Sequence, residues 1–332
     1  MFFKGKKILI TGGTGSCGHQ LVHSLQKQNP QEIVIFSRDE KKHFDMQYEL
    51  REHKNIRFII GDVRDAERIN EALSGIDVVF HTAAMKHVNQ CQQNPSEAVK
   101  TNILGTRNVV NAAISNGVKN VISLSTDKAV MPVNLMGMTK AVGEQMVIEG
   151  NKSPKNKGTK LSCVRYGNVM NSRGSAIPFF RHLLDTNKTI PITDKNMTRF
   201  MLTLGDAIEL IFYAAENGKG GEIFVRKAPS VKIIELAQVL SSQKGRPFKH
   251  NIIGAFPGEK IHETLVSASE MTRTQDKGKY YVITQDNGKS TSSKKDYSSD
   301  KALVTKKEIP ALLNRADMEY KQSHMDDMFR KE

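Results

Sequence analysis

The chain has 332 residues, enough for one large domain or for a main domain that carries a smaller one. Its hydrophobic content is 38%, and no stretch reaches the ~20 consecutive apolar residues of a membrane span, so we expect no membrane segment. The formal charge of +14 is scattered along a chain without tryptophan or any recognisable nucleic-acid-binding pattern, which favours a basic surface that steers anionic substrates over nucleic-acid binding.

The start of the chain leads directly into an apolar strand and a glycine turn, with no pattern of a signal peptide. The three cysteines, Cys17, Cys91 and Cys163, are far apart and have neither disulfide nor metal-site spacing. We therefore expect a cytoplasmic protein without a metal.

Short apolar runs alternate with segments of helical periodicity in the first half. Strands are expected at 7–12, 32–38, 56–63, 77–84 and 120–126, with helices between them, one of which spans 96–117. Near-continuous Val, Ile and Leu runs are typical of strands that are buried on both faces. The pattern predicts an α/β fold with a doubly wound parallel sheet, the NAD(P)-binding Rossmann arrangement.

After a strand at 161–169 the regularity breaks, which predicts a smaller second unit. We expect 1–165 plus 196–228 to form the Rossmann domain and 166–195 plus 229–283 to form the substrate domain. A strand at 222–228 is expected to return to the main sheet. Residues 284–332 are polar and low in aromatics, which favours a flexible extension over a flap or an oligomer arm.

A glycine pattern follows the first strand and precedes a helix. Gly12, Gly15 and Gly18 occur at the spacing G-x-x-G-x-x-G, with Thr14 and Ser16 between them. Glycines at this place allow a tight turn and a close approach of backbone to a pyrophosphate at the helix N-terminus. The alternative is a turn that merely lacks side chains, but the strand–turn–helix context favours a dinucleotide site.

The end of the second strand predicts the choice of dinucleotide. Ser37 and Arg38 stand where an acidic residue would bind the 2′-hydroxyl of NAD, and Lys41 follows. Arg38 can hold a 2′-phosphate, so NADP is favoured over NAD, although Arg38 as a solvated surface charge is the alternative. Farther along, Asp62 and Val63 are expected beside the adenine, and the small Ala83 and Ala84 beside the nicotinamide half.

The residues now described resemble the extended short-chain dehydrogenase/reductases. The resemblance extends over residues 5–282 and narrows to the UDP-N-acetylglucosamine 4,6-dehydratases of bacterial surface-sugar synthesis. The stretches that carry it are "FSRDEKK", "GDVRD", "HTAAMKHV", "TNILGT", "STDKAV", "RYGNVMNSRGS", "ITDKNMTRF" and "PGEKIHETL". It implies a UDP-GlcNAc substrate, an NADP cofactor, a product of the UDP-4-keto-6-deoxy-HexNAc type and a homo-oligomer.

The implied reaction oxidises sugar C4, eliminates water across C5 and C6, and returns the hydride to C6. The resemblance makes Thr126 a hydrogen-bond donor to the C4 oxygen, Asp127 the acid at the C6 hydroxyl and Lys128 the base at C5. A neutral Lys128 requires a pKa below the ordinary value, which Lys140 and the nicotinamide ring would favour. Lys140 would bind the nicotinamide ribose.

Met136 stands where many members of the superfamily have the tyrosine of Y-x-x-x-K. A thioether cannot transfer the C4 hydroxyl proton. Either the protein is a catalytically silent NADP-binding module, or Asp127, Lys128 or a water linked to Lys140 takes that proton. The second reading is favoured, because part of the dehydratase family has M-x-x-x-K; Met136 would then pack beside the sugar or the ring.

The resemblance also implies further contacts. Asn102 is expected to orient the cofactor site structurally, Tyr166 to contact the cofactor and His87 to be packed and hydrogen-bonded. The expected sugar-nucleotide contacts are Lys86, which also faces the cofactor, and Asn168, Ser172, Arg173, Ser175, Thr193, Arg199 and Glu259.

The chain departs from the family pattern before "PGEK". Phe256 replaces an arginine of many relatives, so Lys260 or Arg273 would have to supply that diphosphate contact. A UDP-sugar epimerase or 4-reductase remains the alternative reading of the same fold.

Overall fold

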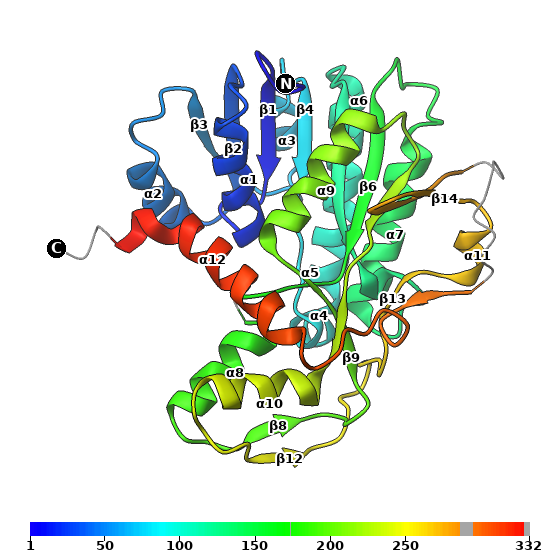
Figure 1. Ribbon diagram of the computed structural model, residues 1–332. Helices are drawn as coiled ribbons and strands as arrows, with labels where there is room; N and C mark the ends of the chain where they lie inside the picture. The colour runs from blue at the N-terminus through cyan, green and yellow to red at the C-terminus, as the bar shows by residue number, and fades with distance from the viewer. Residues whose placement is uncertain (173, 286–294, 329–332) are drawn as a thin grey trace.

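The computed structural model describes residues 1–172, 174–285 and 295–328, with side chains described up to residue 320. Within these ranges nine strands form the main sheet, in the order β14-β15-β10-β6-β5-β4-β1-β2-β3 (Figure 1). Their bounds are β1 Lys7–Thr11, β2 Glu32–Ser37, β3 Ile56–Ile60, β4 Val78–His81, β5 Asn120–Thr126, β6 Lys160–Tyr166, β10 Ile223–Arg226, β14 Thr274–Lys277 and β15 Tyr280–Ile283.

The seven strands from β3 to β10 in this order are parallel, and β15 and β14 add an antiparallel edge. The doubly wound parallel sheet expected from the sequence is thereby confirmed, and so is the return of the strand at 222–228, which is β10, to the main sheet. Burial on both faces explains the continuous apolar runs, because each strand packs against helices above and below.

Helices cover both faces of the sheet. They are α1 Ser16–Gln26, α2 Glu40–Glu49, α3 Ala66–Ala72, α4 Val88–Gln93, α5 Pro95–Val99, η1 Lys100–Gly105, α6 Thr106–Ser115, η2 Asp127–Ala129, α7 Leu135–Gly150 and α9 Leu204–Asn217. One hydrophobic core contains α3, α6 and α7, and the other contains α1 and α9. The helix expected over 96–117 is interrupted by the wider π-helical turn η1, a feature that is common near functional sites.

A smaller unit lies below the carboxyl ends of the parallel strands (Figure 1). Its elements are α8 Ala176–Asp185, β8 Ile190–Ile192, α10 Ile233–Gln243 and β12 His250–Ile252, joined to a sheet of β7 Asn168–Val169, β9 Thr198–Leu202 and β11 Ser230–Lys232. This unit has its own core. Residues 274–283, which the sequence assigned to it, instead pair into the main sheet as β14 and β15.

Within residues 295–328, the C-terminal segment is not the flexible extension that its composition suggested; residues 286–294 and 329–332 of that extension lie outside the described residues. Residues 297–298 form β16 (Tyr297–Ser298), which pairs with β13 (Thr264–Val266). Helix α12 (Ile309–Met328) then crosses from the smaller unit toward α2, and its Ile309, Leu313 and Ala316 are buried in the core of that unit (Figure 1). A few apolar residues at helical spacing suffice to anchor a mostly polar helix, which the overall composition conceals.

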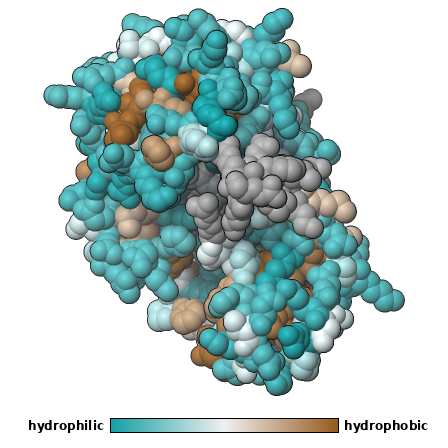
Figure 2. All heavy atoms as spheres, turned by 90° about the vertical axis from the view of Figure 1, so that its left-hand side faces the viewer, coloured by the Kyte–Doolittle hydropathy of each residue, from teal (hydrophilic) through white to brown (hydrophobic). Residues whose placement is uncertain are grey.

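The side of the molecule that carries α2 and the end of α12 is mainly hydrophilic, with hydrophobic side chains in small separate groups (Figure 2). No helix in the described ranges combines the length and apolar character needed to cross a membrane.

Candidate active site

The glycine turn packs too closely for any larger residue. Gly12 has φ +67°, and a Cβ there would lie 2.9 Å from the backbone of Ala83. A Cβ on Gly18 would lie 2.6 Å from the carbonyl oxygen of Gly12. No side chain caps the N-terminus of α1 at Gly15, so its N–H groups are available to an anion. These features fit the pyrophosphate of a dinucleotide.

The residues expected around the adenosine lie at the ends of β2 and β3. Ser37 is buried, and its Oγ hydrogen-bonds to Thr14 Oγ1 at 2.9 Å and to the His43 ring at 2.8 Å. The Arg38 side chain is 59% exposed, and its guanidinium lies 3.6 Å from Asp62. Burial raises the pKa of Asp62, but hydrogen bonds from Arg64 outweigh it and hold the pKa low. Arg38 is thus available to a further anion.

Three other expected cofactor contacts differ in their exposure. Val63 is buried, Ala83 is half-buried and Ala84 is exposed. Lys41 is highly exposed and pairs with Asp45 at 2.7 Å along α2. The structure therefore holds Lys41 along its own helix.

A buried polar cluster follows β5. Asp127 is fully buried, and its Oδ1 accepts hydrogen bonds from Thr126 Oγ1 at 2.8 Å and from Lys128 Nζ at 3.0 Å. Asp127 Oδ2 is buried with no hydrogen-bond partner among the described residues. Lys128 Nζ also lies 3.3 Å from Glu263 Oε1, and Glu263 is only 2% exposed. The cluster therefore brings two buried carboxylates together with one half-buried amine.

The expected lowering of the Lys128 pKa is wrong for this structure. Burial lowers that pKa, but the negative charges of Asp127 and Glu263 outweigh it, and the net shift is upward. The pKa of Lys140, by contrast, is lowered by burial. Glu263 was not among the site residues predicted from the sequence, although it lies within the stretch "PGEKIHETL". Only the fold brings β13 beside the end of β5.

Helix α7 carries Met136 and Lys140 on its buried side. Met136 is 4% exposed and packs with Cys91 and Ala98 in a small apolar cluster. Lys140 is 8% exposed, and its ammonium has no hydrogen-bond or ion-pair partner in the described part of the chain. A buried amine without a partner is a candidate for contact with a bound ligand.

Asn102 fixes the loop after β4. Its Oδ1 accepts from the Met85 backbone N–H at 2.8 Å, while its Nδ2 donates to the Met85 carbonyl and to Thr139 Oγ1, both at 3.0 Å. This loop presents Lys86 and His87, and both are exposed. His87 is therefore not the packed, hydrogen-bonded histidine we expected: it precedes α4 at the surface, as the N-cap residue, and its ring has no hydrogen bond to the described residues.

Two of the expected substrate contacts are paired with each other. Arg199 is 6% exposed and donates to the carbonyls of Thr198 and Ile261 and, at 3.2 Å, to Glu259 Oε1. Glu259 also accepts from the Phe256 backbone N–H at 3.2 Å. The pair places one forked cation at the edge of the cluster around Asp127.

The other expected contacts lie on the segments that connect the two units. Asn168 Oδ1 and Ser175 Oγ are buried with no partner among the described atoms, and Ser172 is half-buried between them. Thr193 Oγ1 lies 3.1 Å from Met197 Sδ. Arg173 lies outside the described residues.

Of the two cations suggested to replace the missing arginine, only Lys260 belongs to this site. Its ammonium donates to the Val130 carbonyl and lies 3.9 Å from Glu263. Arg273 instead donates to the Thr284 carbonyl at the edge of the main sheet.

Two further contacts, neither of them predicted from the sequence, hold the site together. Tyr166 Oη donates to Cys17 Sγ across 3.8 Å and so joins the end of β6 to the first turn of α1. Arg165, 2% exposed, donates to both carboxylate oxygens of Glu144 and of Glu270 and to the Leu265 carbonyl. This network ties α7 to α11 (Ala268–Met271) and β13.

Comparisons with known proteins agree with this architecture. A family model described as "Polysaccharide biosynthesis protein" matches residues 8–285. A relative from Campylobacter jejuni named "UDP-N-acetylglucosamine 4,6-dehydratase (inverting)" is 46% identical over 85% of this chain and 83% of its own length. A Rickettsia prowazekii relative named "UDP-glucose 4-epimerase" is 44% identical over 94% and 90%. The X-ray structure of Pen from Bacillus thuringiensis covers 95% of this chain and 100% of its own, with 39% identity and a TM-score of 0.90.

Proposed function

The chain belongs to the polysaccharide biosynthesis protein family, and from that membership we propose that it is an NADP-dependent UDP-N-acetylglucosamine 4,6-dehydratase, a hydro-lyase. The substrate would be UDP-GlcNAc and the product a UDP-4-keto-6-deoxy-HexNAc. The observation that carries the proposal is the cluster in which the half-buried Thr126 and Lys128 meet the buried carboxylates of Asp127 and Glu263.

This cluster suits elimination of water better than it suits a reaction that only oxidises C4 and then reduces it again. Loss of water across C5 and C6 needs one group that takes the C5 proton and another that protonates the departing C6 hydroxyl. Asp127 and Lys128 offer such an acid–base pair 3.0 Å apart. Met136 occupies the place of a tyrosine that would serve only the C4 oxygen. The groups of this site that can transfer protons would therefore serve C5 and the C6 hydroxyl.

The residues described above fit a nicotinamide dinucleotide. The glycine turn and the uncapped N-terminus of α1 would hold its pyrophosphate, Arg38 the 2′-phosphate and Lys140 the nicotinamide ribose. When bound, NADP⁺ supplies acceptance of a hydride from sugar C4 and its later return to C6. The choice of NADP predicts that Arg38→Ala weakens binding of NADP⁺ about 10- to 100-fold, the loss of one charge-assisted hydrogen bond, and leaves NAD⁺ binding unchanged.

The raised pKa of Lys128 is compatible with its role as a base if the proton moves within the pair. Transfer of one proton from Lys128 Nζ to Asp127 converts the ion pair into a neutral amine and a carboxylic acid. Burial works toward that neutral form, since desolvation disfavours charge, whereas the nearby carboxylate of Glu263 favours the charged amine. The amine would then accept the C5 proton and later return it to C5, while the acid protonates the C6 hydroxyl, which leaves as water. The C4 hydroxyl proton, lost on oxidation, would leave through a water linked to Lys140, and one proton from solvent would restore the charge of Lys128 at the end of the cycle. Thr126 would hold the C4 oxygen by a hydrogen bond.

The sugar nucleotide would bind between the two units. Arg199 has the forked donors that suit a diphosphate, and a diphosphate there would compete with Glu259 for them. Glu259 would then be released to accept from the ribose hydroxyls. Asn168 and Ser175, whose buried polar atoms have no described partner, would serve the sugar.

The test is direct. Purified protein is incubated with UDP-GlcNAc and NADP⁺, and the sugar is followed by proton NMR. We expect the C6 hydroxymethyl signals to be replaced by a 6-methyl doublet, and Lys128→Ala to slow that change by about 10²- to 10⁴-fold, the usual contribution of general acid–base catalysis. If no methyl signal appears with the wild-type protein, or if Lys128→Ala is fully active, the assignment fails.

A second candidate is UDP-glucose 4-epimerase, because relatives with that name are as similar to this chain as the dehydratase relative. Both reactions remove the C4 hydroxyl proton, which Met136 cannot take. Epimerisation must also return a proton to the C4 oxygen, and it has no use for an acid–base pair at C5 and C6 such as Asp127 and Lys128. The same NMR assay with UDP-glucose separates the two activities, because epimerisation gives UDP-galactose with its hydroxymethyl group intact.

A further inference from the structure

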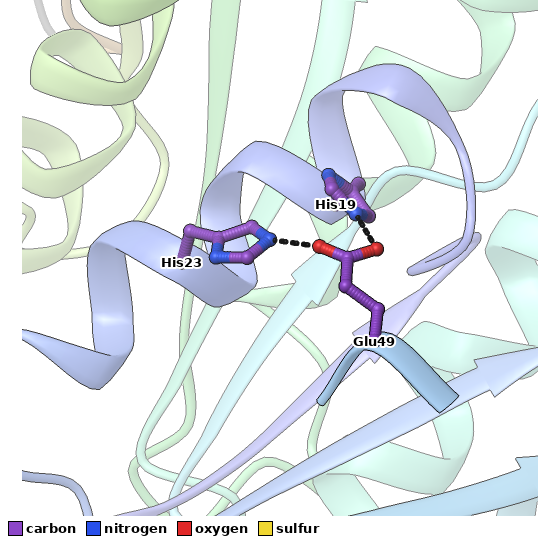
Figure 3. Close-up of side chains that lie close together, drawn as sticks. All are labelled: His19, His23 and Glu49. Carbon is purple, nitrogen blue, oxygen red and sulfur yellow. Dashed lines mark hydrogen bonds and ion pairs between the residues drawn. The ribbon is translucent and has the colours of Figure 1, made fainter. Parts of the chain in front are cut away.

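Two histidines and a glutamate converge on the outer side of the Rossmann domain. His19 and His23 lie one turn apart on α1 and therefore on the same face of the helix. Glu49 is the last residue of α2. Figure 3 shows both rings directed at the carboxylate, with His19 Nε2 at 2.8 Å from Oε2 and His23 Nε2 at 2.8 Å from Oε1. Neither the glycine turn nor the proposed chemistry accounts for this arrangement.

The three groups are close and partly sheltered. One ligand atom from each lies within 4.8 Å of the others, and the two rings are 4.6 Å apart. The side chains are 22%, 23% and 11% exposed, in the order His19, His23 and Glu49. His19 and Glu49 also line a cleft of about 430 Å³ that opens between α1, α2 and α12, so an ion from solvent can reach them.

We propose that His19, His23 and Glu49 form a binding site for a Zn²⁺-like divalent cation. Imidazole nitrogen and carboxylate oxygen are preferred ligands of Zn²⁺, and three protein ligands leave a fourth position for water. Burial raises the pKa of Glu49, but hydrogen bonds from both histidines outweigh it and hold that pKa below its ordinary value, so the carboxylate is ionised. The cation would replace the two N–H protons that now bridge the groups.

The rearrangement that this requires is small. With Zn–N and Zn–O distances of about 2.1 Å, ligand atoms of a tetrahedral site lie about 3.4 Å apart. The present 2.8 Å nitrogen–oxygen contacts would open by about 0.6 Å, which modest rotation of side chains supplies. Two ligands four residues apart on one helix already share the required face.

A cation at this position would affect the structure, because it would join two helices that begin beside the proposed dinucleotide site. Helix α1 begins at the glycine turn, and α2 begins directly after Arg38 and Asp39. A cation held by both helices would clamp together the two segments proposed to hold the dinucleotide. It would contact none of the groups in the Asp127 cluster, so its binding can be measured in the absence of the sugar nucleotide and of the proposed reaction.

The experiment uses the whole protein, freed of metal by a chelator. It is titrated with Co²⁺, whose tetrahedral complexes absorb visible light, and then with Zn²⁺ as competitor; Mg²⁺, which prefers oxygen ligands, is the negative control. We expect one equivalent of Co²⁺ to bind, Zn²⁺ to displace it, and Zn²⁺ but not Mg²⁺ to raise the melting temperature. The variant His19→Gln/His23→Gln should lose the absorption and the thermal shift, whereas His53→Gln, at an exposed histidine beyond α2, should retain both.

A second readout needs no variant. Zn²⁺ should slow modification of His19 and His23 by diethylpyrocarbonate, measured by mass spectrometry, and leave His53 as reactive as before. Absence of Co²⁺ absorption in the wild type, binding that persists in the double variant, or equal protection of His53 would each overturn the proposal. Absent Co²⁺ absorption or equal protection of His53 would mean that the three residues only join α1 to α2 by hydrogen bonds.

Discussion

The charge network around Arg165 should respond sharply to a single change, Glu144→Gln. Arg165 and Glu144 are 2% and 3% exposed at their side chains, and two hydrogen bonds join them at 3.0 and 2.7 Å. Glutamine keeps the shape but loses the charge and presents an N–H₂ group to a guanidinium that can only donate. One carboxylate, that of Glu270, would remain to balance the buried cation.

The expected cost follows from this geometry. Breaking a buried ion pair by neutralising one partner destabilises a protein by about 3–5 kcal/mol. For 332 residues the unfolding entropy is about 0.7 kcal/mol/K, so the melting temperature should fall by about 4–7 °C. The network also ties α7, which carries Lys140, to β13 beside Glu263, so we expect the proposed dehydratase activity to fall as well.

Differential scanning calorimetry on purified variants measures the effect. The matched control is Glu71→Gln, which removes the same charge from an exposed pair with Arg68 whose side chains are 44% and 67% accessible. That change should cost less than about 1 kcal/mol, because exposed ion pairs contribute little. A melting temperature of Glu144→Gln within about 1 °C of the control would refute the idea that this network is a major support of the fold.

Three other predictions address the site. Gly12→Ala should abolish dinucleotide binding, measured by calorimetric titration, because its Cβ would meet backbone 2.9 Å away. The control Gly75→Ala, at a similar φ of +70° with nothing within 4 Å, should cost only the ~1–2 kcal/mol of left-handed strain and leave binding intact. Equal binding by both variants would contradict the role of the glycine turn in dinucleotide binding. Glu263→Gln removes a charge that raises the pKa of Lys128, so the neutral amine would form at lower pH and the acidic limb of the kcat/KM profile should move to lower pH; a move to higher pH would speak against Lys128 as base. Burial raises the pKa of Cys17 to about 11, so the folded protein should resist alkylation there until it is denatured, and rapid modification seen by mass spectrometry would show that this thiol is accessible.

Local sequence patterns predicted the parts of the fold that depend on residues close together in the chain. Apolar runs buried on both faces predicted the parallel strands, and the glycine spacing predicted the tight turn before α1. The helix at 96–117 was predicted only in part, because the π-helical turn η1 arises where Asn102 reaches back to the Met85 backbone. A contact over that separation has no local signature.

The remainder depended on contacts that are distant in sequence. Glu263 joins Lys128 only because β13 packs against the end of β5, and its charge reverses the expected shift of the lysine pKa. Three buried apolar residues anchor α12: Ile309, Leu313 and Ala316. They are too few to change the polar composition of the C-terminal segment, so composition did not predict a packed helix there. Likewise, His19 and His23 have metal-binding spacing, but Glu49 completes the set from another helix.

The most direct test of the proposed function follows one hydrogen atom. UDP-GlcNAc that carries deuterium at C4 is incubated with the protein and catalytic NADP⁺, and the product is examined by NMR and mass spectrometry. We expect loss of water with the deuterium recovered at C6, as a singly deuterated methyl group. Recovery of substrate, of a C4 epimer that retains its hydroxymethyl group, or of a methyl group without the label would contradict it.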